Sequence, residues 1–216
     1  LNLIGYGVEN KVERIVYASS MSVYGAVKSE PVKESQECSP LSCYGVGKHS
    51  AEGYLRIYQD KLPFVAMRMF NVYGPGQNMS NLRQGMVSIY LAQALDSGTI
   101  EVKGNVDRFR DLIFIDDVVE AWFRAATYQS AIGQTINLGT GVKTTVANLL
   151  HQICELVPGS DYFVTNGTVG DQSGIFADTT NLQSKLSMTA FTPVNEGLKK
   201  FIYWALKSEK SGPILK

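Results

Sequence analysis

The stretch "IVYASSMSVYGAVKSEPVKESQECSPLSCYGVGKHSAEGY", residues 15–54, joins a short apolar run to a helix-like segment. The run "RIVYAS", residues 14–19, is β-branched and almost wholly apolar, which is typical of a strand buried on both faces of a sheet. Ser39 can cap a helix and Pro40 suits the first helical position. The stretch therefore predicts a buried strand followed by a polar loop and a helix.

The rest of the chain alternates between strand-like and helix-like segments, which indicates an α/β fold with a largely parallel sheet. Ligands of such sheets bind at the carboxyl ends of the strands, and polar residues follow two strands there. Ser19 and Ser20 end the first strand and Asn71 follows the next. The further strand-like runs are 62–73, 99–104, 110–115, 134–139 and 161–166, and the helix-like runs are 1–11, 82–97, 117–128, 145–156 and 192–207.

Composition excludes several classes of protein. Of the 216 residues, 44% are apolar and 19% are charged, with a formal net charge of zero, so no basic surface for nucleic acid is indicated. Three scattered cysteines and two histidines argue against a disulfide framework or a metal site and fit a cytoplasmic protein. No apolar run approaches the ~20 residues that span a bilayer, so no membrane association is expected.

Ser20, Tyr44 and Lys48 form a set that can move a proton to or from a hydroxyl group. On a helix, Tyr44 and Lys48 lie one turn apart on the same face. A phenol ionises near pH ~10, and a neighbouring ammonium favours its phenolate form. The set suits oxidation of a sugar hydroxyl, in which Ser20 holds the oxygen and Tyr44 takes its proton beside a nicotinamide cofactor.

Several short motifs occur in order along nearly the whole chain. They are "VYASSMSVYG", "YGVGK", "RMFNVYGPG", "RFRDLIFIDDVVEA", "NLGTG", "GDQSGIFAD" and the "EGL" of the last helix. Together they resemble the extended short-chain dehydrogenase/reductase family, in its branch of NAD-dependent nucleotide-sugar epimerases and dehydratases. Their order is far more specific than any one of them.

The resemblance implies catalytic roles for Ser20, Tyr44 and Lys48. It also implies that the same three residues, together with Ser19 and Phe70, contact NAD.

For the nucleotide-diphosphate sugar, with UDP the expected nucleotide, the resemblance implies contacts from Asn71, Arg110 and Asp171. An arginine fork suits phosphate oxygens. No metal is implied. Arg68, on a buried strand, is instead expected to form a structural ion pair, and Tyr24 is expected to serve packing.

Two positions depart from the dehydratase branch, which carries an acidic pair after its catalytic residue. Met21 and Ser22 stand there, and neither can protonate a departing hydroxyl at neutral pH. The resemblance therefore implies NAD-dependent epimerisation at carbon 4 through a transient 4-keto sugar. A 4-keto-sugar reductase using NAD(P), a dehydratase, or a non-catalytic fragment that binds nucleotide sugar remain the alternatives.

The glycine-rich loop that dinucleotide-binding folds carry after their first strand is absent before Ser19. "GYGVEN", residues 5–10, has glycines, but it lies late in a helix and leads into a strand. We therefore expect an N-terminal part of the fold, which selects NAD or NADP, to precede this chain. The chain alone is expected to be inactive and to hold NAD poorly.

The resemblance also predicts the domains and the assembly. Residues 1–76 and 112–140 are expected to form the C-terminal part of a Rossmann-like NAD-binding domain. Residues 77–111 and 141–216 are expected to form a smaller lobe for the nucleotide sugar. The helices at 1–11 and roughly 40–60 are expected to pack against their mates in a homodimer.

Overall fold

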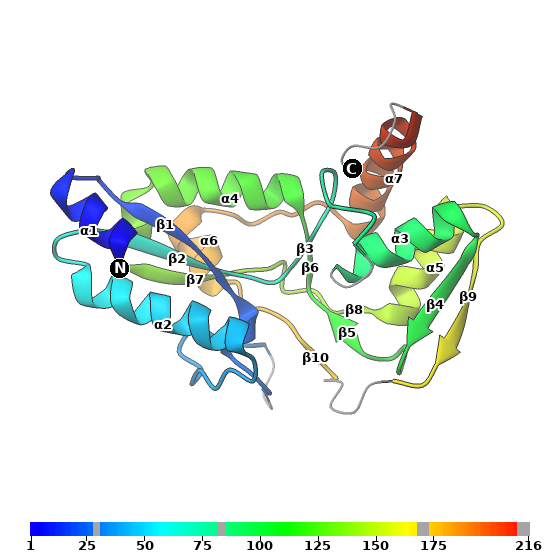
Figure 1. Ribbon diagram of the computed structural model, residues 1–216, viewed down its shortest axis with the longest axis horizontal. Helices are drawn as coiled ribbons and strands as arrows, with labels where there is room; N and C mark the ends of the chain where they lie inside the picture. Colours follow the sequence, from blue (N-terminus) through cyan, green and yellow to red (C-terminus); the bar gives the residue numbers. More distant parts are fainter. Residues whose placement is uncertain (28–30, 82–84, 168–172, 211–216) are drawn as a thin grey trace.

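The structure is a computed structural model that describes residues 1–27, 31–81, 85–167 and 173–210. A parallel sheet flanked by helices occupies one side, and a group of helices beside a second pair of strands occupies the other (Figure 1). Within the described ranges, no helix combines the length and apolar character needed to cross a membrane. The helices are α1 (Asn2–Glu9), α2 (Cys43–Tyr58), α3 (Met86–Asp96), α4 (Ile115–Thr127), α5 (Val146–Leu156), α6 (Thr180–Leu186) and α7 (Val194–Lys210).

The main sheet holds β1 (Ile15–Ser20), β2 (Phe64–Met69) and β7 (Gln134–Leu138) in the order β1-β2-β7, all parallel. Ser20 lies beside Met69 in the register, so the carboxyl ends of β1 and β2 meet at one edge. The parallel sheet predicted from the sequence is confirmed. The other strands are β3 (Asn71–Tyr73), β4 (Thr99–Lys103), β5 (Phe109–Arg110), β6 (Leu112–Phe114), β8 (Thr144–Thr145), β9 (Asp161–Thr165) and β10 (Gly174–Ile175).

Alternate residues of β1 and β2 supply two separate cores, one on each face of the main sheet. Ile15 and Tyr17 pack with α1 and α2, whereas Val16 packs with α4 and α6. Burial on both faces explains why these strands read as nearly continuous apolar runs.

Helix α2 begins at Cys43, not at Pro40, so the prediction that Ser39 caps it was wrong. Ser42 is the cap: its backbone is extended and its hydroxyl accepts a hydrogen bond from the Gly45 N–H at 3.1 Å. A cap must reach an N–H group two or three residues on, and only Ser42 does so here. The one-turn spacing of Tyr44 and Lys48 is unaffected, because both lie inside the helix.

Gly45 brings the first turn of α2 close to the end of β1. A Cβ atom built at Gly45 would lie 2.5 Å from the carbonyl oxygen of Ser22, which is in the short 3-10 turn Met21–Val23 that follows β1. Only a residue without a side chain permits this approach. It sets Tyr44, the next residue back, beside the serines at the strand end.

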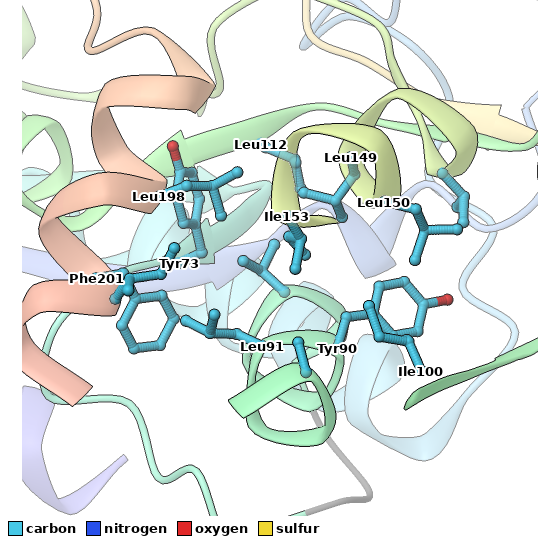
Figure 2. Close-up of a cluster of buried hydrophobic side chains, with 14 of the residues drawn as sticks. Tyr73, Tyr90, Leu91, Ile100, Leu112, Leu149, Leu150, Ile153, Leu198 and Phe201 are labelled. Carbon is cyan, nitrogen blue, oxygen red and sulfur yellow. The ribbon is translucent and has the colours of Figure 1, made fainter. Parts of the chain in front are cut away.

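A third core lies between α3, α5, α7 and β4, and Figure 2 shows its side chains pointing toward one another. Tyr73 and Phe114 stack edge to face there with ring centroids 5.6 Å apart, which ties β3 and β6 to α7. The division of the chain into the two expected domains stays a prediction. Helix α6 belongs to residues 141–216, the range expected for the sugar lobe, and it packs against β7 of the main sheet.

Candidate active site

A cavity of about 590 Å³ opens where β1, β2 and β3 end. It brings together five residues that the sequence singled out: Ser19, Ser20, Tyr44, Phe70 and Asn71. The described residues that line it are uncharged; hydroxyl, amide and apolar side chains suit a hydroxyl-rich sugar and a flat ring better than a free ion.

Tyr44 and Lys48 lie as their spacing on the helix predicts. Tyr44 is 57% exposed and lines the cavity. The Lys48 Nζ donates a hydrogen bond to the Ala18 carbonyl at 2.7 Å and lies 5.3 Å from the centroid of the Tyr44 ring. An ammonium at this distance is within range of a cation–π contact with the ring.

Ser20 is the last residue of β1 and also the cap of the short turn Met21–Val23. Its hydroxyl accepts from the Ser22 N–H and donates to the Ser22 hydroxyl, both at 3.2 Å. The cap keeps the Ser20 hydroxyl at the cavity wall. Ser22, which stands where the dehydratase pattern has an acid, lines the same cavity.

Ser19 points to the opposite side of the strand from Ser20. It is fully buried, and its hydroxyl donates to Glu52 Oε1 at 2.5 Å. Glu52 also binds Arg68 in a buried ion pair, with Oε2 and Nη2 2.7 Å apart, which confirms the expected structural role of Arg68. The sequence reasoning missed Glu52, although it lies one turn after Lys48 on the face that carries Tyr44.

Tyr24 is buried as expected for a packing residue. Its ring lies under the Arg68 guanidinium, 4.8 Å from centroid to Cζ, and its hydroxyl donates to Asn137 Oδ1 at 2.6 Å. Burial is the main reason that the pKa of Tyr24 rises to about 12. A phenol with a raised pKa stays protonated at neutral pH, which agrees with a packing role for Tyr24.

Asn71 is held by a residue that the sequence reasoning did not single out. Its backbone N–H and its side-chain Nδ2 both donate to the Asp111 carbonyl at 3.1 Å. The Asp111 carboxylate is fully buried and accepts from the Thr140 N–H and hydroxyl, the Gly141 N–H and the Ala177 N–H, at 2.7–3.0 Å. The signal in the sequence was an acidic residue at the head of the apolar run "LIFI".

Arg110 is not among the described residues that line the cavity. Arg110 is on β5, between β8 and β10, and its Nη1 donates to the neighbouring Phe109 carbonyl at 2.7 Å. Asp171 lies outside the described residues. In the part of the chain that the structure describes, Arg110 and Lys48 do not line the cavity, and no cluster of His, Cys, Asp and Glu could hold a metal ion.

A model of the NAD dependent epimerase/dehydratase family matches residues 1–139. The chain belongs to this family. The family is NAD-dependent, which confirms the cofactor expected from the sequence. An exposed phenol, a nearby ammonium and the Phe70 side chain beside the cavity fit the ribose and the flat ring of a nicotinamide nucleoside.

Members of known activity are similar to the chain over much of its length. UDP-glucose 4-epimerase of Mycolicibacterium smegmatis is 35% identical over 153 residues, which cover 69% of this chain and 48% of the relative. The dTDP-4-dehydro-6-deoxyglucose reductase of Escherichia coli is 27% identical over 202 residues, 90% of this chain and 62% of the relative.

Among solved structures, MoeE5 in complex with UDP-glucuronic acid and NAD is 32% identical, with a TM-score of 0.85 over 95% of this chain and 69% of MoeE5. The Rossmann-type α/β fold expected from the sequence is thereby confirmed. The chain spans 48% and 62% of the two curated relatives, so it matches only part of each.

Proposed function

We propose that this chain carries the catalytic residues of an NAD-dependent 4-epimerase that acts on a nucleotide-diphosphate sugar, UDP-sugars first among them. The observation that carries the proposal is the Tyr44 phenol, set at the cavity between the Lys48 ammonium and the Ser20 strand end. The similarity to a UDP-glucose 4-epimerase and to MoeE5, which binds UDP-glucuronic acid and NAD, supports it.

In this proposal each residue has one chemical task. Ser20 donates a hydrogen bond to the oxygen on sugar carbon 4, and Tyr44, as phenolate, takes the proton of that hydroxyl. Lys48 stabilises the phenolate charge. Loss of the proton from the oxygen and of hydride from carbon 4 gives the 4-keto sugar, which rotates in the cavity. Hydride then returns to the other face of carbon 4, and Tyr44 gives the proton back to the carbon-4 oxygen. NAD, when bound, supplies the reversible hydride acceptor, with Ser19, Ser20, Tyr44, Lys48 and Phe70 as its proposed contacts on this chain.

Asn71 and Arg110 are proposed to bind the diphosphate, and Asp171 is proposed to lie near the nucleotide ribose. A dehydratase is disfavoured because the two residues after Ser20 are Met21 and Ser22, and a hydroxyl group is too weak an acid to protonate a departing hydroxide at neutral pH. A 4-keto-sugar reductase is the second candidate, and the similarity to dTDP-4-dehydro-6-deoxyglucose reductase favours it.

The two candidates differ in net redox change. Protein expressed from the complete coding region is incubated with UDP-glucose, UDP-N-acetylglucosamine and UDP-glucuronic acid, and the products are followed by proton NMR. We expect the carbon-4 epimer of at least one sugar with no net change in NADH absorbance. Stoichiometric consumption of NADPH with a 4-keto sugar, and no epimer from any substrate, would instead identify the reductase.

We also propose a homodimer through α1 and α2. Large apolar side chains are exposed at both helices, each at least 45% exposed: Leu3 and Tyr6 on α1, with Leu1 just before it, and Val46, Tyr54 and Ile57 on α2. The two helices pack on the same buried cluster, and large apolar side chains exposed on such a pair are a feature of protein interfaces.

A further inference from the structure

Three groups lie near the Lys48 ammonium. Helix spacing predicted only one of them, the Tyr44 ring. The Ala18 carbonyl accepts its hydrogen bond at 2.7 Å, and the Tyr44 ring lies 5.3 Å away. The third is Tyr17, whose ring centroid is also 5.3 Å from Nζ. The Lys48 ammonium therefore contacts two aromatic rings, one from α2 and one from the sheet.

Tyr17 reaches this position because of the strand's alternation. It belongs to the same face of β1 as Ile15 and Ser19, the face that packs against α2. Its neighbour in the chain, Ala18, provides the carbonyl that accepts from Lys48. One short segment of β1 thus supplies both a hydrogen-bond acceptor and a ring face to the same ammonium.

The ring centroids of Tyr17 and Tyr44 are equally far from Lys48 Nζ, but the two side chains lie in different surroundings. Tyr44 is exposed and lines the cavity, whereas Tyr17 is half-buried and is not among the described residues at the cavity wall. Burial raises the pKa of Tyr17, and the charges of Glu52 and Tyr44 raise it further. Tyr17 accordingly stays a neutral phenol at working pH, so it does not compete with Tyr44 for the substrate proton.

We propose that Tyr17 is a positioning residue, whose ring face holds the Lys48 ammonium against the Ala18 carbonyl and beside Tyr44. The inference rests on the proposed function, because it assigns Tyr17 to the same Ser-Tyr-Lys chemistry. Lysine has a flexible four-carbon stem, and one hydrogen bond leaves its head free to swing. The negative face of an aromatic ring attracts the ammonium and restricts that motion.

The ring face, not the hydroxyl, is the group that acts, so two substitutions separate the possibilities. Tyr17→Phe keeps the ring face and Tyr17→Leu removes it. Tyr58→Leu is the matched control, because Tyr58 is a half-buried tyrosine packed on the same apolar cluster, at the far end of α2 from Tyr44. All three are made in the protein expressed from the complete coding region.

We expect Tyr17→Phe and Tyr58→Leu to keep kcat within about twofold of the unchanged enzyme. Tyr17→Leu should lower kcat on the order of tenfold, the scale of a lost cation–π contact, with KM for the nucleotide sugar almost unchanged. The thermal stabilities of the two leucine variants should fall together, which separates a packing loss from a loss of positioning.

A second measurement needs neither cofactor nor turnover. Lysine labelled with ¹³C at Cε gives one NMR signal for each lysine, and Lys48→Arg identifies that of Lys48. Two flanking rings should displace this signal upfield in the unchanged protein and in Tyr17→Phe. In Tyr17→Leu it should move back toward the signals of the other lysines.

Each adverse outcome overturns the proposal. Unchanged kcat and an unmoved Lys48 signal in Tyr17→Leu mean that the ring does not hold the lysine. Loss of activity in Tyr17→Phe assigns the role to the hydroxyl, and an equal loss in Tyr58→Leu reduces it to packing. If the unchanged enzyme turns over no nucleotide sugar, the proposed function fails, while the NMR signal still decides whether Tyr17 positions Lys48.

Discussion

Glu52 of α2 and Arg68 of β2 form a two-contact ion pair that is almost wholly buried. Glu52 Oε1 lies 3.0 Å from Nε and Oε2 lies 2.7 Å from Nη2, and the two residues are 1% and 2% exposed. Ser19 donates to the same carboxylate, so one side chain ties α2 to two neighbouring strands. This contact sets how the helix that carries Tyr44 and Lys48 sits on the sheet.

Glu52→Gln should destabilise the fold by about 3–5 kcal/mol, because it leaves the Arg68 charge buried without its partner. Urea denaturation followed by circular dichroism measures this free energy of unfolding. Glu120→Gln is the control, since it removes the partner of Arg124 in an exposed i,i+4 pair and should change stability little. Equal effects of the two substitutions would show that the buried pair contributes no more to the free energy of unfolding than the exposed pair does.

The contribution of Glu52 to stability should depend on pH. Burial by itself raises the pKa of Glu52, but the hydrogen bonds and charge of Arg68, with the Ser19 hydrogen bond, outweigh it and lower the pKa below its usual value. A lowered pKa stabilises the fold above the unfolded-state value near ~4.3, and this contribution is lost as the pH falls through the folded-state pKa.

The measurement is the difference in unfolding free energy between the unchanged protein and Glu52→Gln, followed from pH 7 downward. We expect a constant difference near neutral pH that shrinks in the acid range below about pH 4, because glutamine does not titrate. A difference that stays constant to the acid end would mean that the pKa of Glu52 is the same in the folded and the unfolded protein.

Tyr44→Phe should lower turnover of the nucleotide sugar by roughly 10²–10⁴-fold, the usual worth of general acid–base catalysis. Binding of the nucleotide sugar, measured by calorimetry, should stay nearly unchanged because only one hydroxyl is removed. Tyr54→Phe, on the same helix and 45% exposed, should be as active as the unchanged enzyme. Near-normal turnover in Tyr44→Phe would remove Tyr44 from the mechanism.

Arg110→Ala should weaken binding of a UDP-sugar by about 1–3 kcal/mol, through loss of charged hydrogen bonds to phosphate. Arg110→Lys should recover only part of this loss, because lysine keeps the charge but not the planar fork. Calorimetric titration with UDP-glucose measures both. Unchanged affinity in Arg110→Ala would show that Arg110 does not bind the diphosphate.

The proposed dimer predicts that Ile57→Glu yields a monomer at micromolar concentration in sedimentation velocity. Ile57 is 75% exposed on α2, and a charge there would be costly to bury between two subunits. Tyr203→Glu, at an apolar side chain that is 61% exposed on α7, should leave the dimer intact. An unchanged protein that sediments as a monomer would refute the proposal itself.

The local relationships in the site could be predicted because they depend on neighbours in the chain. Tyr44 and Lys48 share a helix face wherever that helix packs, and serines that end a buried strand lie at the sheet edge. The start of the helix was predicted less well. Ser39 and Ser42 are equally good caps by composition, and the choice depends on the path of the loop toward the 3-10 turn Met21–Val23.

The sequence by itself determined the α/β class, the parallel sheet and the residues that meet at its edge, since a repeating apolar pattern and helix spacing are properties of the chain. Only the tertiary structure decided that Ser19 faces Glu52 and that Tyr17 lies against Lys48. The same is true of the hydrogen bond that the Asp111 carboxylate accepts from the Thr140 N–H. These contacts join residues about thirty or more positions apart, and their geometry depends on how helix and sheet pack together. Packing of this kind is set by the shapes of both partners at once, so no single stretch of sequence contains it.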